Sequence, residues 1–132
     1  MPPLTRWFVK LSLIYFVVAL AAGVWQAAGG PPWLTPVMIH LLVVGWVTGM
    51  IIGVSYWMFP KYSLAEPRGM DWLAVASFAL LNLGLLVRVV AEPVHAIHPS
   101  GGAAVLLVLS AILQWLGAVA FVLNTWPRVK GR

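Results

Sequence analysis

The sequence predicts an all-α membrane protein: a four-transmembrane-helix bundle with N- and C-termini cytoplasmic. Three observations support this fold class. First, 62% of the 132 residues are hydrophobic and 8% are charged, and the mean hydropathy is +0.96, which is too apolar for a soluble domain of this length. Second, the chain contains four apolar runs, each long enough to cross a bilayer as a helix of about 20 residues. Third, the basic residues lie between these runs and mostly on one side of them.

The four runs define the predicted helices of a single domain over residues 1–132. Their continuity differs from the alternation of barrel strands, and helices are the other structure that lipid permits. The first run is longer than the roughly 7–15 apolar residues of a signal peptide, so we expect it to be a membrane helix. Prolines at 60, 93 and 127 follow three of the runs and favour helix ends there. The predicted helices cover residues 7–28, 36–59, 70–91 and 103–126.

Basic residues indicate the orientation through the positive-inside rule. Arg88 is the only basic residue near the predicted outer side. The other seven lie on the predicted inner side: Arg6, Lys10, Lys61, Arg68, Arg128, Lys130 and Arg132. We therefore expect a multi-pass protein of the inner (cytoplasmic) membrane, surrounded by lipid. The same spread, without a basic patch interleaved with aromatic residues, gives no indication of nucleic acid as a partner.

The sequence lacks the residues that several kinds of site and activity need. The chain has no cysteine, which excludes disulfides and thiolate metal sites. It shows no hydrolase triad, phosphate loop or general acid/base pair, so no enzymatic activity is predicted. Its three acidic residues, Glu66, Asp71 and Glu92, are expected in loops or at helix ends. A proton-coupled transporter is disfavoured because such a protein needs a carboxylate in mid-membrane.

The second run, HLLVVGWVTGMIIGVSYWMFP from His40 to Pro60, contains the main candidate site. An ionisable residue inside a membrane segment is a functional candidate, and neutral imidazole is a common metal ligand. At 100° per residue, one face of this helix carries an apolar wall beside His40 that suits a flat macrocycle or ordinary helix packing. That face comprises His40, Val44, Val47, Ile51 and Met58, with Gly45, Gly49 and Gly53 roughly opposite. The glycines favour close approach of another helix, either in a homo-oligomer or within the chain.

Arg88 is expected at the same depth as His40, since each lies about four residues, or roughly 6 Å, inside its predicted outer helix end. Its guanidinium suits a carboxylate such as a haem propionate. It also suits an interfacial arginine whose stem lies in lipid and whose partner is Glu92, four residues on. Ser77, Leu81 and Gly84 share its helical face and favour the bundle interior.

His95 and His98 form an H-x-x-H pair in the loop predicted after the third run. Two histidines at this spacing can share a metal ion if the segment forms a turn, and they can equally be solvated loop residues. Met38 lies close to His40 in sequence and adds a soft donor. These four residues suggest copper as the alternative to haem.

The pattern His40-Leu41-Leu42, Gly45-Trp46, Gly49, Gly53, Tyr56 and Pro60 resembles a known helix. It is similar to the low-spin-haem helix of haem-copper oxidase and nitric oxide reductase catalytic subunits, and to related haem-binding bacterial membrane proteins. The resemblance implies that His40 is an axial ligand of haem b near the outer surface, with Arg88 as a propionate partner.

The chain also departs from that family. The full enzymes have many more helices and further histidines, including the copper ligands, whereas no other predicted membrane segment here has a histidine. Reduction of oxygen or nitric oxide at a haem-copper centre is therefore not expected. A sixth ligand would be His95, His98 or a residue of a second protomer, and without one the iron would have an open position for a gas.

The leading hypothesis is a small membrane haem b protein for electron transfer with a redox partner protein, or for sensing a diatomic gas or haem. One alternative is a non-catalytic accessory or assembly subunit that packs on a larger membrane complex through its glycines. The other is a copper-handling membrane protein.

Overall fold

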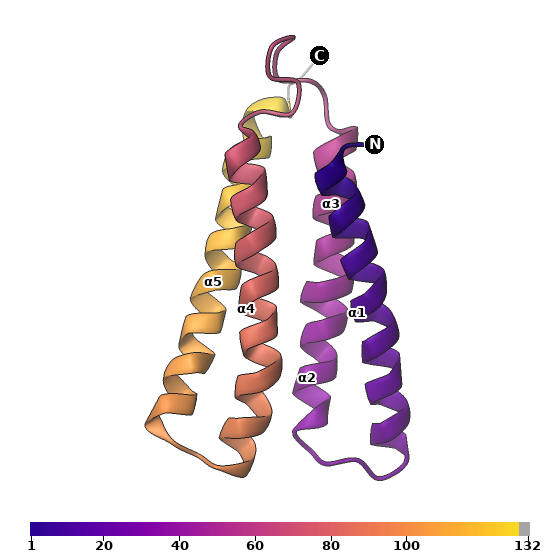
Figure 1. The fold of residues 1–132 in the computed structure, drawn as a ribbon, viewed down its shortest axis with the longest axis vertical. Coiled ribbons are helices and arrows are strands. Elements are labelled where there is room, and N and C mark those ends of the chain that lie inside the picture. The colour runs from indigo at the N-terminus through magenta and orange to yellow at the C-terminus, as the bar shows by residue number, and fades with distance from the viewer. Residues whose placement is uncertain (130–132) are drawn as a thin grey trace.

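The computed structural model describes residues 1–129, and all four long helical segments in that part of the chain are apolar and long enough to span a membrane. Figure 1 shows that they form two antiparallel hairpins. In the first hairpin, α1 (Pro3–Ala27) packs against α2 (Leu34–His40), η1 (Leu41–Thr48) and α3 (Gly49–Met58), which follow one another without a break. In the second, α4 (Asp71–Ile97) packs against α5 (Gly101–Thr125), which is followed by the short 3-10 helix η2 (Trp126–Arg128). The predicted all-helical fold with four candidate spans is confirmed.

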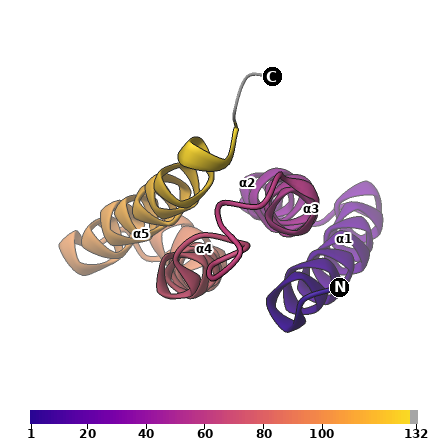
Figure 2. The same ribbon diagram turned by 90° about the horizontal axis from the view of Figure 1, so that it is seen from above.

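The two hairpins meet mainly where α2 and η1 lie against α4. Seen from above, α1 and α5 are at opposite sides of the bundle (Figure 2). The N-terminus, η2 and the 59–70 loop are at one end, and the two hairpin turns are at the other (Figure 1). We name these the inner and outer ends, after the orientation that the basic residues predict; Lys130 and Arg132 lie outside the described residues.

Helix α4 is longer than predicted, because it passes through Pro93 and ends at Ile97 instead of Ala91. Proline removes one backbone hydrogen bond but is tolerated in membrane helices, where neighbouring groups compensate. The final turn still closes, with His98 N donating to Val94 O at 2.8 Å. The loop predicted for residues 92–99 is therefore wrong over most of its length. Glu92 and His95 are helical residues.

Residues 41–48 form a π-helix, which the predicted 100° spacing did not anticipate. A π-helix has i→i+5 hydrogen bonds and thus a wider turn than an α-helix. The Thr48 hydroxyl has the same five-residue spacing from its acceptor and donates to Val43 O at 2.8 Å. Consequently, residues before and after this segment are rotated relative to their positions in a regular α-helix.

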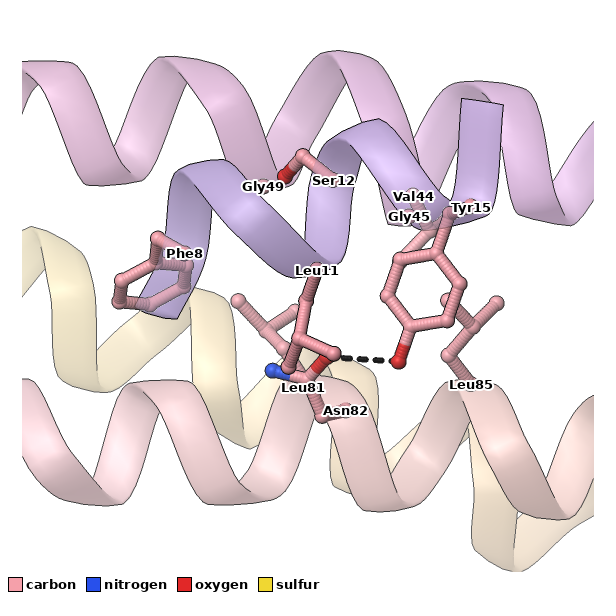
Figure 3. Close-up of a pocket in the computed structure, with 10 residues that line it drawn as sticks. All are labelled: Phe8, Leu11, Ser12, Tyr15, Val44, Gly45, Gly49, Leu81, Asn82 and Leu85. Carbon is pink, nitrogen blue, oxygen red and sulfur yellow. Dashed lines mark hydrogen bonds between the residues drawn. The ribbon is translucent and has the colours of Figure 1, made fainter. Parts of the chain in front are cut away.

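The three glycines of the second span face α1 of the same chain. A Cβ at Gly45 would lie 2.8 Å from the ring of Tyr15, and a Cβ at Gly53 would lie 2.5 Å from Cβ of Phe8. Gly49 lies between them, against Ser12, as Figure 3 shows. Because α1 occupies this face, a second protomer would have to displace α1 to reach the glycines.

The interior between α1, η1 and α4 is closely packed. Tyr15 OH donates to Asn82 Oδ1 at 2.8 Å (Figure 3). Asn82 Nδ2 in turn donates to Phe78 O at 2.7 Å. The cavity beside this pair has a volume of about 10 Å³, which is the space of about one water molecule. The first of these hydrogen bonds links α1 to α4 in mid-bundle, and the interior has no room there for a larger ligand.

Candidate functional site

A polar cluster joins the two hairpins near the outer end; we call His40, Arg88 and Glu92 the outer cluster. Glu92 Oε1 lies 3.0 Å from His40 Nδ1 and 3.8 Å from Arg88 Nη1. The side chain of Glu92 is only 10% exposed, against 18% for Arg88 and 28% for His40. The carboxylate therefore lies between an imidazole of α2 and a guanidinium of α4, largely shielded from solvent.

Helix geometry explains how these three residues meet. Arg88 and Glu92 are four positions apart on α4, so their side chains are on the same face one turn apart. Glu92 lies roughly 8 Å before the end of α4 and His40 roughly 9 Å after the start of α2, at 1.5 Å per residue. The two helices are antiparallel, and these residues therefore reach the same level. Arg88 is one turn deeper, so Glu92, and not Arg88, is level with His40.

Both helices depart from regular α-geometry directly beside this contact. The π-segment η1 begins at Leu41, the residue after His40, and Pro93 follows Glu92. Proline has no N–H for the carbonyl of Val89, four residues earlier. π-segments are frequent at functional sites, and irregular helical backbone in a membrane protein is common where groups are arranged for a ligand. The irregularities mark the outer cluster as the leading candidate site.

The tautomer of His40 follows from its two neighbours. Nδ1 lies 2.9 Å from Pro36 O and 3.0 Å from Glu92 Oε1. A carbonyl oxygen and a carboxylate oxygen both accept hydrogen bonds, so Nδ1 carries the proton. In neutral imidazole the other nitrogen, Nε2, then keeps its lone pair. This is the arrangement found for metal-bound histidines, in which the non-ligating nitrogen donates to a carbonyl or carboxylate.

Three buried polar atoms along the outer half of α4 have no hydrogen-bond partner among the described residues: Arg88 Nε, Glu92 Oε2 and His95 Nδ1. Positions 88, 92 and 95 are spaced i, i+4 and i+7 and therefore lie along one face of the helix. Buried polar groups in proteins are nearly always paired. Unpaired ones along a single face are consistent with a site for an additional polar group or for water.

An apolar hollow of about 380 Å³ lies at the same end, among α1, α2 and α4. Leu41 in its wall is next to His40, and Val89 and Pro93 are next to Arg88 and Glu92 in sequence. Ligand sites of about 300–1,000 Å³ lined by apolar and aromatic side chains are typical for small molecules and cofactors. The two tryptophans in its wall, Trp25 and Trp33, pack edge to face with centroids 5.8 Å apart.

The predicted apolar wall beside His40 is not brought together on one surface. Val44 points into the interior, where it lines the cavity beside Tyr15 (Figure 3). Val47 and Ile51 are 42% and 56% exposed, so they face outward from the bundle. The reason is the π-segment, whose wider turn separates positions that an α-helix would align.

The other predicted donors lie on α4, at its C-cap and on α2, and they differ in exposure. His98 is exposed at the C-cap of α4, and His95 is half-buried one turn earlier. Met38 packs against α1, with Sδ 3.3 Å from the position of a Cβ on Gly23. No group of three or more His, Asp or Glu in the described part of the chain is arranged to hold a metal ion.

Sequence reasoning missed the contact between His40 and Glu92. The i, i+4 spacing suggests a pairing of Glu92 with Arg88, but Pro93 predicts a helix end before Glu92 and so places this residue in a loop. Its position four residues after Arg88 is the signal in the sequence for a helical carboxylate. Comparison with protein-family models, curated proteins and solved structures gives no match for this chain.

Proposed function

We propose that this chain is a small membrane protein of the inner (cytoplasmic) membrane, with both termini in the cytoplasm, that binds haem b through His40. The observation that carries the proposal is the position of that imidazole: Nδ1 lies within hydrogen-bond distance of two oxygen acceptors, and in the neutral ring this leaves the lone pair of Nε2 for a metal ion. Haem supplies an iron centre that exchanges one electron or binds a diatomic gas. We therefore place the function in electron transfer or in sensing a gas or haem.

The residues at the outer end fit such a group in two further respects. Arg88 keeps Nε buried and without a partner among the described residues, which leaves a donor for a carboxylate such as a propionate. The apolar hollow at the same end is lined by sequence neighbours of the outer cluster and not by the cluster itself, and it offers the kind of surface that binds a flat hydrophobic ring. The interior cavity, at about 10 Å³, is too small for a macrocycle in mid-bundle, which is compatible with a haem at the outer end beside His40.

The number of axial ligands separates the two forms of the function. His40 is the only imidazole of the outer cluster, and His98 is exposed at the end of α4. A second strong ligand, from His95, His98 or another protomer, favours electron transfer, whereas an open position favours gas binding. Carbon monoxide difference spectra of the reduced protein distinguish them, because only an open or weakly held position binds the gas.

The deciding experiment is the absorption spectrum of the full chain, purified in detergent after expression with added haem precursor. We expect a Soret band in the wild type and in His98→Ala, and its loss in His40→Ala. Circular dichroism of each variant checks that the helices are retained. The proposal is wrong if the wild type has no Soret band, or if His40→Ala, with its helices intact, keeps the band unchanged.

A further inference from the structure

The carboxylate of Glu92 is the acceptor that distinguishes His40 from an ordinary interfacial histidine. A backbone carbonyl four residues earlier, such as Pro36 O, is available to any histidine on a helix. Glu92 instead comes from the other hairpin and is nine-tenths buried. Its approach depends on the packing of α2 against α4, so the contact is a property of the tertiary structure.

We propose that Glu92 is a positioning residue for His40 and that it fixes the Nδ1–H tautomer and the orientation of the ring. The negative charge of Glu92 also makes Nε2 a stronger electron-pair donor to a metal ion. The proposal rests on haem binding by His40 for its effect on iron, but the tautomer itself does not need haem. Carboxylates that accept from a ligating histidine raise the basicity of that ligand. A more basic axial ligand stabilises the oxidised iron and lowers the reduction potential.

Arg88 sets the environment of this carboxylate. Its Nη1 lies 3.8 Å from the same oxygen that faces His40. An opposite charge at this distance favours the ionised carboxylate, whereas the low solvent exposure of Glu92 disfavours it. The described acidic and basic side chains in contact with Glu92 are His40 from α2 and Arg88 from α4. Arg88 is thus the α4 charge that opposes the effect of burial on the carboxylate that faces the imidazole.

Two variants and one control test the role of the charge. Glu92→Gln keeps the shape but loses the negative charge, and Glu92→Asp keeps the charge on a side chain one methylene shorter. Glu66→Gln removes the same charge from the exposed 59–70 loop at the inner end, and it is the matched control. The haem affinity of Glu92→Gln is expected to fall about 10- to 100-fold, as for other second-sphere partners of metal ligands.

The reduction potential provides a readout that a merely structural role would not move. We expect Glu92→Gln to raise it, and a tenfold shift in the oxidised-to-reduced preference corresponds to about 59 mV for one electron. Glu92→Asp should lie between Glu92→Gln and the wild type. Glu66→Gln should match the wild type. Equal potentials and affinities for Glu92→Gln and the wild type would overturn the proposal while leaving haem binding intact.

Nitrogen NMR of the haem-free protein, with labelled histidine, separates this inference from the proposed function. We expect His40 in the wild type to be the Nδ1–H tautomer, and Glu92→Ala to shift it toward a mixture. If the wild type binds no haem but shows this dependence, the proposed function fails and the positioning contact stands. If the tautomer is the same in both proteins, Glu92 does not position His40.

Discussion

The hydroxyl of Ser12 lies 2.5 Å from the place that a Cβ on Gly49 would occupy. No other atom is as close: the next are Cβ of Ser12 and Val44 O, both at 3.8 Å. A single hydroxyl oxygen of α1 therefore limits the space for a side chain at this point of the second span. Small residues at helix crossings in membranes allow this close approach, which yields van der Waals contact that lipid does not replace.

Gly49→Ala should destabilise the first hairpin by about 1–3 kcal/mol, the usual cost of overpacking. The double variant Gly49→Ala/Ser12→Ala should recover most of the loss, because it removes the one oxygen that the new methyl group meets. Denaturant titration in mixed micelles, followed by circular dichroism, measures both.

Gly102→Ala is the matched control, since a Cβ there meets no atom within 4 Å. It lies in the first turn of α5 and should change the stability by no more than about 0.5 kcal/mol. A double variant as unstable as Gly49→Ala alone would contradict the assignment of the clash to the Ser12 hydroxyl.

Arg128 closes the inner end and is only 1% exposed. Its guanidinium donates to Tyr56 O, Phe59 O and Pro60 O at 3.0, 2.9 and 3.0 Å, which are carbonyls at and just beyond the end of α3. Such carbonyls have no partner within the helix. Arg128→Ala should therefore cost about 3 kcal/mol, because several charge-assisted hydrogen bonds are lost together.

Arg6→Ala removes an exposed positive charge at the same end and is the control for Arg128→Ala. It should alter the stability by no more than about 0.5 kcal/mol. Thermal unfolding in detergent at matched protein concentration compares the two. Equal midpoints would show that the carbonyls of α3 find other partners when the guanidinium is absent.

The hydrogen bond between Tyr15 and Asn82 predicts coupling between the hairpins. Tyr15→Phe removes the donor and keeps the ring against Gly45. Hydrogen bonds between membrane helices contribute about 0.6 kcal/mol on average and reach about 1.7. A double-mutant cycle with Asn82→Ala should give a coupling energy in this range, and a value of zero would mean that the contact adds no stability.

The orientation is testable because the chain has no cysteine of its own. Leu64→Cys places a thiol on an inner-end residue that is 95% exposed, and Ala28→Cys places one at the exposed turn after α1. If the positive-inside rule holds, a membrane-impermeant maleimide labels Cys at 28 in intact cells and Cys at 64 only after lysis. The opposite pattern would invert the topology.

Much of the fold could be predicted from apolar length and basic residues, which act over whole segments. For three of the four spans, the predicted and observed boundaries differ by only a few residues. The exception is the span that forms α4, whose predicted end is too early because Pro93 predicts a helix end. Proline is a reliable stop in water, where the freed carbonyl is solvated, but less so in a bundle whose neighbours support the backbone. That single difference turned the predicted loop carrying Glu92 and His95 into helix.

The candidate site could be predicted only in part, because the sequence reveals which residues are ionisable but not how the packed helices turn them. His40 and Arg88 were identified individually as ionisable groups in apolar spans, a property that sequence alone reveals. The face on which Val44, Val47 and Ile51 fall depends on the turn width of residues 41–48, and that width is set by backbone hydrogen bonding within the packed structure.

The sequence by itself determined that this chain is helical, that it has four segments able to cross a membrane, and which polar residues those segments contain, because length and composition fix these properties locally. Only the tertiary structure decided that Glu92 meets His40 and that the glycines face α1. These contacts join residues distant in the chain, and they depend on the rotation and depth of each helix, which packing between helices sets.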